Sequence, residues 1–217
     1  MLGFAYLGRE VREPDTTRAD QRLLGRVVEQ THAWPLDLPK TISLFGTVPL
    51  IILATAAVGA PLAWSGRWPG TALLIAATLG AVLLSAVTKH LVGRARPTAF
   101  FRTSATGYSF PSGHALNATC FALALGFILW RLPWRRAAKI AGSLGLVAYT
   151  LCIGASRLVL GVHYPTDVLG GFLLGVAWMA LLAALFRVVE RRWTARRTLP
   201  GGTGAAPSAQ SSPDSAV

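Results

Sequence analysis

Three groups of residues between positions 89 and 167 combine long cations, two histidines, one carboxylate and a serine-glycine pair. Arginine offers a planar fork to phosphate oxygens and lysine offers a point charge, and the free N–H groups at a helix N-terminus favour an anion. The pattern therefore predicts a site for a phosphate ester. The candidate residues are Lys89, Arg96, Pro97, Ser112, Gly113, His114, Ser156, Arg157, His163 and Asp167.

Within this set, His163 and Asp167 are four residues apart, which is about one turn of a helix. An aspartate in that position can accept a hydrogen bond from one ring nitrogen, which fixes the tautomer and leaves the other nitrogen free to attack. His114 is then the candidate acid. Ser112 and Gly113 open a long apolar run, where glycine lets backbone N–H groups approach a phosphate and serine adds a hydroxyl donor.

Each candidate also has a simpler interpretation when it is taken singly. Lys89, Arg96 and Arg157 resemble interfacial anchors at the ends of apolar spans. Ser112 is a common helix N-cap type. The long loop 93–111 carries further cations beside Arg96, and these stay outside the predicted site.

A zinc site is the metal alternative for the same residues. His114, His163 and Asp167 would be a three-ligand set. Three cationic side chains in the same pocket would repel a divalent ion, so we predict no metal and no cofactor.

The elements that position these residues are long and apolar. Four stretches between positions 41 and 186 carry a single charged residue, Arg67, with His114 counted as neutral. Runs of about 17–25 apolar residues match the hydrocarbon core of a bilayer. We therefore predict an all-α, polytopic transmembrane helical bundle with about five to six spans, and a larger soluble part with fewer spans is the weaker alternative. The five legible spans are roughly 43–64, 71–92, 112–130, 138–157 and 166–187.

The placement of charge indicates orientation. The net charge of +12 would suit nucleic acid, but four cations lie in the loop 131–139 and five lie in the segment 187–197, beside predicted spans. Such juxtamembrane clusters face the cytoplasm, and the alternating spans bring the candidate residues to the opposite face. We therefore predict no nucleic-acid partner, a multi-pass cell-membrane protein, a cytoplasmic C-terminus and an active site on the extracytoplasmic face.

The chain divides into three predicted parts. Residues 1–40 are polar and mixed in charge, with Leu23, Leu24, Val27 and Val28 at helical spacing, which predicts an amphipathic surface helix or a plain solvated one. Residues 41–190 form the predicted catalytic transmembrane domain. Residues 191–217 are basic and then rich in Gly, Pro, Ala and Ser, which predicts disorder.

Three motifs occur in order: K-x6-RP at 89–97, PSGH at 111–114 and SR-x5-H-x3-D at 156–167. With the wider stretches SFPSGHA and GVHYPTDVLGG, they resemble the three-part signature of the PAP2 (type 2 phosphatidic acid phosphatase) superfamily, which includes vanadium haloperoxidases and glucose-6-phosphatase-like enzymes. No fixed position departs from that signature. Many membrane members have six spans, whereas five spans and an amphipathic lead-in are legible here.

The resemblance implies a PAP2/haloperoxidase-like helical core and a role for each motif residue. His163 would be the nucleophile that forms a phosphohistidine, and Asp167 would orient it and stabilise its charge. His114 would protonate the leaving oxygen and then help to activate water. The substrate phosphate would be bound by Lys89, Arg96, Ser112, Gly113 and Arg157.

The function implied by the resemblance is metal-independent hydrolysis of a lipid phosphate or diphosphate. Phosphatidic acid, phosphatidylglycerol phosphate, diacylglycerol diphosphate and a prenyl diphosphate such as undecaprenyl diphosphate all fit, and the Ala-, Arg- and Gly-rich composition favours the prenyl diphosphate. A lipid-to-lipid phosphotransferase is one alternative. A non-enzymatic membrane transporter is another, disfavoured because the charges lie at one interface and not at the midplane. The oligomeric state is left open.

Overall fold

The computed structural model of the chain describes residues 2–198, and every regular element among them is a helix. This confirms the predicted all-α class. The predicted disorder of the C-terminal tail concerns residues that lie almost entirely outside the described range. The helices are α1 (Leu2–Glu10), α2 (Pro14–Gln30), α3 (Asp37–Leu44), α4 (Val48–Trp64), α5 (Trp68–Val92), the 3-10 helix η1 (Thr98–Phe100), α6 (Gly113–Arg131), α7 (Arg136–Val159) and α8 (Pro165–Thr198).

Four helical segments are long and apolar enough to cross a membrane: α5, α6, α7 and the part of α8 from Pro165 to Val188. They match four of the five predicted spans. The fifth, predicted at roughly 43–64, corresponds to a pair of helices, α3 and α4, bent by 51° at a short break. Counting this pair as one span brings the described part of the chain to five.

The break between α3 and α4 has a local cause. Thr47 has extended backbone angles, and Pro49 lies in the first turn of α4. Proline has no N–H to donate to a preceding turn, so it suits the first turn of a helix and does not continue one. The span predicted at roughly 43–64 thus corresponds to α4 from Val48 to Trp64 and the bend that precedes it.

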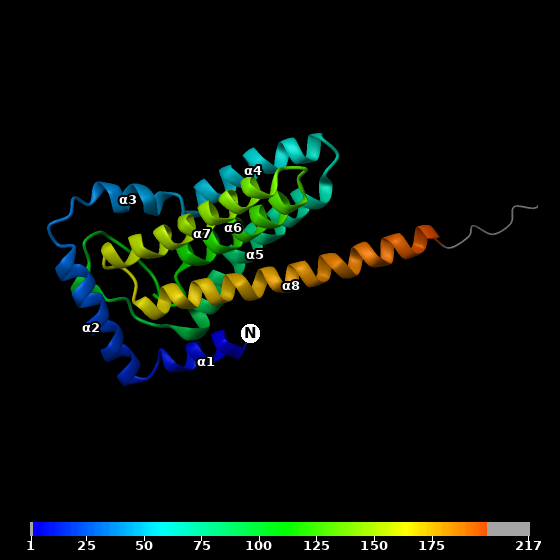
Figure 1. The fold of residues 1–217 in the computed structure, drawn as a ribbon. Coiled ribbons are helices and arrows are strands. Elements are labelled where there is room, and N and C mark those ends of the chain that lie inside the picture. Colours follow the sequence, from blue (N-terminus) through cyan, green and yellow to red (C-terminus); the bar gives the residue numbers. More distant parts are fainter. Residues whose placement is uncertain (1, 199–217) are drawn as a thin grey trace, which may run out of the picture. The chain divides into compact units, whose positions relative to one another are not determined.

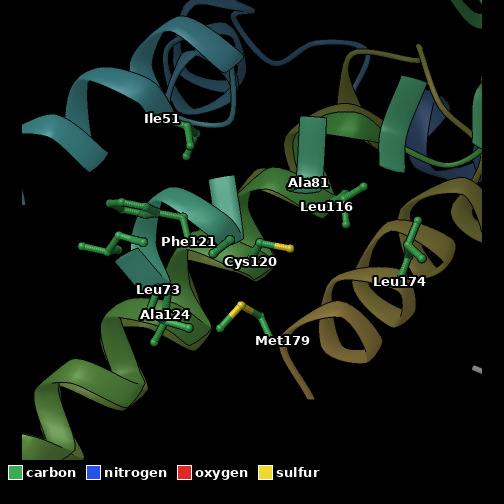
Figure 2. Packing of buried hydrophobic residues seen from close by; sticks show 11 residues of the cluster. Ile51, Leu73, Ala81, Leu116, Cys120, Phe121, Ala124, Leu174 and Met179 are labelled. Carbon is green, nitrogen blue, oxygen red and sulfur yellow. The ribbon is translucent and has the colours of Figure 1, made fainter. Parts of the chain in front are cut away.

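The core lies where α4, α5, α6 and α8 meet, as Figure 2 shows. α6 is central, because it packs against α4, α5 and α7, and most of its first three turns are buried. Small side chains let membrane helices approach closely, which is the main source of packing energy in lipid. The residues labelled in the close-up are Ile51, Leu73, Ala81, Leu116, Cys120, Phe121, Ala124, Leu174 and Met179.

One glycine contact joins the core to the candidate site. A Cβ on Gly171 would lie 2.6 Å from the carbonyl oxygen of Ser112 and 2.9 Å from the Cβ of Ala115. Neither distance is sterically allowed, so only glycine lets α8 lie this close to the start of α6. The first turn of α8 is thereby held against the N-terminus of α6.

The N-terminal segment contains the predicted helix, as α2. Figure 1 shows α2 at the end of the bundle where α7 ends and α8 begins, and α2 contacts α7 and η1. Leu24 is buried, whereas Leu23 of the predicted apolar face is exposed. α2 is thus partly a packed helix. Residues up to Leu182 form one compact unit that holds every candidate site residue, and the chain from Ala183 forms a second unit.

Candidate active site

The site forms where four helix ends meet: the C-termini of α5 and α7 and the N-termini of α6 and α8. The N–H of Ser112 donates to the carbonyl of Asp167 at 2.9 Å, which joins α6 to α8. A Cβ on Gly113 would lie 4.0 Å from Cε of Lys89, which joins α6 to α5. The alternating spans predicted that these ends share one face, and the contacts agree with that prediction.

His163 lies at the centre of this junction, in the turn before α8, with a side chain that is almost fully buried. Its Nδ1 lies 3.5 Å from Oδ2 of Asp167. Its Nε2 lies 3.2 Å from Nη1 of Arg96. One ring nitrogen therefore faces a carboxylate and the other faces a cation, so the two nitrogens are chemically distinct.

The surroundings of His163 keep its ring neutral. Burial lowers the pKa of His163 from 6.5 to about 4. Asp167 opposes this shift, and the charges of Arg96 and Arg157 add to it. A neutral imidazole near pH 7 has a free lone pair, which a nucleophile or a general base requires.

Asp167 is completely buried and accepts hydrogen bonds from three donors, none of them His163, whose Nδ1 has no hydrogen-bond partner among the described residues. The hydroxyl of Ser109 and the backbone N–H of Tyr164, the latter at 2.8 Å, both donate to Oδ2. Nη1 of Arg94 donates to Oδ1 at 2.7 Å. The carboxylate is thus fixed from both sides, and a buried carboxylate with this many donors keeps its negative charge.

Arg94 is a site residue that is not among the candidates predicted from the sequence. Its Nη1 also donates to the hydroxyl of Thr166 at 2.8 Å, and its Nη2 donates to Oδ2 of Asp20 at 2.7 Å. The guanidinium lies 4.3 Å from the ring centre of Tyr164. The position of Arg94 two residues before Arg96 in the motif loop was the one available signal. Nothing in the sequence indicates a role in the site for Asp20, because it lies among mixed polar residues of α2.

The remaining predicted cations point their donors into the same region. Nζ of Lys89 donates to the carbonyl of Tyr108 at 2.6 Å. Nη1 of Arg157 donates to the hydroxyl of Ser43 in α3, so α3 also takes part in the site. Among the described residues, Nε of Arg157 and the hydroxyl of Ser112 are buried and have no hydrogen-bond partner. Both are donors that an anion between them would satisfy.

His114 lies in the first turn of α6. A side chain at Gly46 would come within 3.2 Å of its Cβ, so the break between α3 and α4 lies directly beside it. The cationic side chains of Arg157, Arg96 and Lys89 are close enough to act electrostatically on the ring of His114. The structure thus brings together all eight residues for which the sequence predicted catalytic or phosphate-binding roles.

The two other candidate residues, Ser156 and Pro97, do not present donors to this region. The hydroxyl of Ser156 donates back to the carbonyl of Ile153 within α7. Pro97 precedes η1 as its N-terminal flanking residue. Their contribution is to shape the chain around the site.

The loop that carries His163 depends on Gly161. Its φ is +68°, and a Cβ there would lie 1.8 Å from the carbonyl oxygen of Phe100. Only glycine has both the conformation and the space that this position requires. The contact holds the His163 loop against η1, where the N–H of Arg102 also donates to the carbonyl of Leu160 at 3.1 Å.

Among the side chains that the structure describes, no three His, Cys, Asp or Glu groups are placed to hold a metal ion. The charged groups of the site are dominated by Lys89, Arg96 and Arg157. An electropositive site of this kind is suited to bind an anion directly.

Comparison with known proteins defines the class of this helical membrane protein. Residues 70–191 match the family model of the PAP2 superfamily. The fold matches the crystal structure of a transmembrane PAP2-type phosphatidylglycerolphosphate phosphatase from Bacillus subtilis with a TM-score of 0.79 and 27% identity, covering 87% of this chain and 94% of that one. The chain belongs to the PAP2 superfamily.

Its curated relatives are named as phosphatases. Phosphatidylglycerophosphatase B of Bacillus subtilis is 28% identical over 197 residues, which cover 88% of this chain and 94% of the relative. A lipid A 1-phosphatase of Rhizobium etli is 30% identical, with coverage of 77% and 75%. An undecaprenyl-diphosphatase of Sulfolobus acidocaldarius is 33% identical, with coverage of 48% of each chain. The protein is accordingly an enzyme, a PAP2-type phosphatase.

Proposed function

We propose that the protein hydrolyses a phosphate or diphosphate ester of a membrane lipid through a phosphohistidine on His163. The observation that carries this proposal is the position of the His163 ring. One nitrogen faces Asp167 and the other faces Arg96, at 3.5 and 3.2 Å. A nucleophile needs an orienting base on one side and bound substrate on the other, and this ring is flanked in that way.

The proposed reaction has two displacements at phosphorus. In the first, Nε2 of His163 bonds to phosphorus, the bond from phosphorus to the leaving oxygen breaks, and His114 gives that oxygen a proton. In the second, His114 takes a proton from water, whose oxygen attacks phosphorus, and the bond to Nε2 breaks. Inorganic phosphate leaves and His163 is restored. Asp167 stabilises the positive ring in between.

The phosphate oxygens would be held by the donors around the ring. The hydroxyl of Ser112 and Nε of Arg157 are already buried without partners among the described residues. Lys89 and Arg96 donate to main-chain carbonyls in this structure and would transfer donors to a phosphate. Phosphoryl transfer depends mainly on positioning and charge stabilisation, which these groups supply without a metal.

The first candidate substrate is phosphatidylglycerol phosphate. The relative and the crystal structure that match nearly the whole chain are both named for that lipid. Undecaprenyl diphosphate is the second candidate, because relatives named for it match about half of the chain at 33–34% identity. The composition of the sequence favoured the prenyl diphosphate, whereas the longer matches favour the glycerophospholipid.

The test is phosphate release by the purified protein in detergent from a panel of lipids: phosphatidylglycerol phosphate, undecaprenyl diphosphate, phosphatidic acid and diacylglycerol diphosphate. We expect turnover of at least one lipid, full activity in EDTA and inhibition by vanadate. No phosphate release from any lipid would favour the transporter. Activity lost in EDTA and restored by zinc would overturn the metal-free mechanism. Transfer of labelled phosphate to an added lipid alcohol would identify a phosphotransferase.

A further inference from the structure

Asp20 is a buried carboxylate in a segment that the sequence separated from the catalytic domain. Its side chain, in α2, is 2% exposed. A charge is costly to bury unless it is paired and hydrogen-bonded. Oδ2 of Asp20 accepts from Arg94 and from the hydroxyl of Thr166, and Oδ1 accepts from the N–H of Thr166 at 3.2 Å. Asp20 is therefore fully engaged with the start of α8 and the motif loop.

Arg94 connects this carboxylate to the one beside the nucleophile. The Arg94 side chain is 5% exposed and donates through separate nitrogens to Asp20 and Asp167, each at 2.7 Å. Tyr164 covers one face of the guanidinium. Because the fork is planar and rigid, the orientation imposed by Asp20 at one nitrogen also determines the direction of the other. A continuous series of contacts, the positioning relay, thus runs from Asp20 through Arg94 and Asp167 to His163.

We propose that Asp20 and Arg94 are positioning residues for the reaction at His163, and that docking of α2 onto the bundle completes the active site. The inference rests on the proposed function. Asp20 does not touch the reacting atoms; it acts through Arg94. Arg94 acts through Asp167, whose Oδ2 must face Nδ1 of His163.

The pair of carboxylates has an electrostatic consequence as well as a geometric one. A single arginine beside Asp167 would neutralise the charge that must stabilise the positive ring of His163 in the intermediate. A second carboxylate on the same guanidinium leaves a net negative charge in the group. Asp20 therefore keeps Asp167 effective as a partner for the phosphohistidine.

The decisive variant is Asp20→Asn, which keeps the shape and one acceptor of the side chain but removes its charge. We expect kcat to fall about tenfold while KM changes less than about twofold, since the residue acts on the transition state and not on substrate binding. The matched control is Asp15→Asn on the same helix. Asp15 is exposed and, among the described residues, pairs with Arg18 at the surface, so its variant should keep wild-type kcat.

A double-variant cycle separates a relay from two independent structural contacts. Arg94→Lys should lower kcat by more than Asp20→Asn, because one ammonium cannot hold both carboxylates in a fixed fork. The combination of Asp20→Asn with Arg94→Lys should be no worse than Arg94→Lys alone, since Asp20 acts only through Arg94. Multiplicative effects of the two changes would contradict the proposal.

Folding is checked in parallel by the thermal transition of each variant in detergent. If Asp20→Asn does not fold, Thr166→Val replaces it: this change removes the hydroxyl shared by Asp20 and Arg94 and keeps the side-chain shape. A smaller fall in kcat at unchanged KM is then expected. Wild-type kcat in either folded variant would overturn the relay, as would an activity loss that only follows the thermal transition.

A readout without turnover separates this proposal from the proposed function. In protein with ¹⁵N-labelled histidine, Asp20→Asn should change the ring-nitrogen shifts of His163 and leave those of His32 and His90 in place. Absence of turnover in the wild type together with this shift would overturn the phosphatase mechanism and retain the relay. Wild-type turnover with unchanged His163 shifts in Asp20→Asn would overturn the relay alone.

Discussion

Arg96 and His163 face each other within the site, with Nη1 of the arginine 3.2 Å from Nε2 of the ring. The opposite ring nitrogen faces Asp167. The nitrogen proposed to attack phosphorus is therefore next to a cation proposed to hold the phosphate. The chemical roles around this ring can be tested one at a time.

Replacing the nucleophile should abolish turnover. His163→Ala should lower kcat by at least ~10³-fold, because no other group can carry the covalent intermediate. Labelled substrate and a rapid alkaline quench should trap phosphoprotein in the wild type and none in the variant. His90→Ala is the control, since His90 is exposed on α5 and should keep wild-type activity. Turnover by His163→Ala near the wild-type rate would end the phosphohistidine mechanism.

Neutralising the orienting carboxylate should impair chemistry and spare binding. We expect Asp167→Asn to lower kcat by ~10²–10⁴-fold with KM changed little, because the amide cannot stabilise a positive ring and can favour the wrong tautomer. Steady-state kinetics measures both constants. Asp37→Asn, in the first turn of α3, is the control. A rise in KM at constant kcat would instead assign Asp167 to substrate binding.

Shortening the arginine fork should weaken phosphate binding. Arg157 donates through Nη1 to Ser43 and retains an unpartnered, buried Nε among the described residues. A lysine cannot keep both donors in place. Losing one charge-assisted hydrogen bond of about 1.5–3 kcal/mol predicts a fall in kcat/KM of roughly 10–100-fold in Arg157→Lys. Arg67→Lys, in the exposed turn before α5, should be neutral in the same assay. Equal kcat/KM values for the two variants would remove Arg157 from the phosphate site.

The lowered pKa of His163 predicts acid sensitivity of the fold. The pKa falls from 6.5 in the unfolded chain to about 4 in the folded protein. Between these two values, the unfolded state binds a proton at His163 that the folded state does not bind. Above about pH 6.5, His163 therefore does not lower the free energy of unfolding. As the pH falls toward 4, it lowers that free energy increasingly, by on the order of 3 kcal/mol. The thermal transition of the wild type should therefore fall more steeply over this range than that of His163→Gln. Parallel curves for the two proteins would show that the His163 pKa is close to its ordinary value.

The positions of the basic loops predict which side of the membrane holds the site. The loops at 65–70 and 131–139 and the segment 187–197 carry one, four and five cations. Basic segments beside membrane spans should be cytoplasmic, which would place the motif ends of the alternating spans on the other side. A fluorescent protein that folds only in the cytoplasm, fused after Val217, should therefore be bright. A dark fusion with an active periplasmic reporter at the same point would move the site to the cytoplasmic face.

The motif residues and the apolar spans were readable from sequence because both are local signals. Lys89 and Arg96 share one stretch of chain, Ser112 to His114 share another, and Arg157 to Asp167 share a third. The length of an apolar run predicts a membrane span without any knowledge of the helices that pack against it. Spans that alternate in direction then bring the motif ends to one face. The order of the motifs and spans along the chain was therefore enough to predict which residues share the site.

The contacts that hold this set in place were decided by the tertiary structure. Asp20, on a mixed polar face of α2, is locally like any solvated acid, and only docking of that helix buries it against Arg94. Ser43 lies at the start of the predicted span 43–64, and only the bend between α3 and α4 places its hydroxyl beside Arg157. The local sequence around a short polar side chain does not indicate its partner. Its role depends on which distant segment packs over it and excludes water.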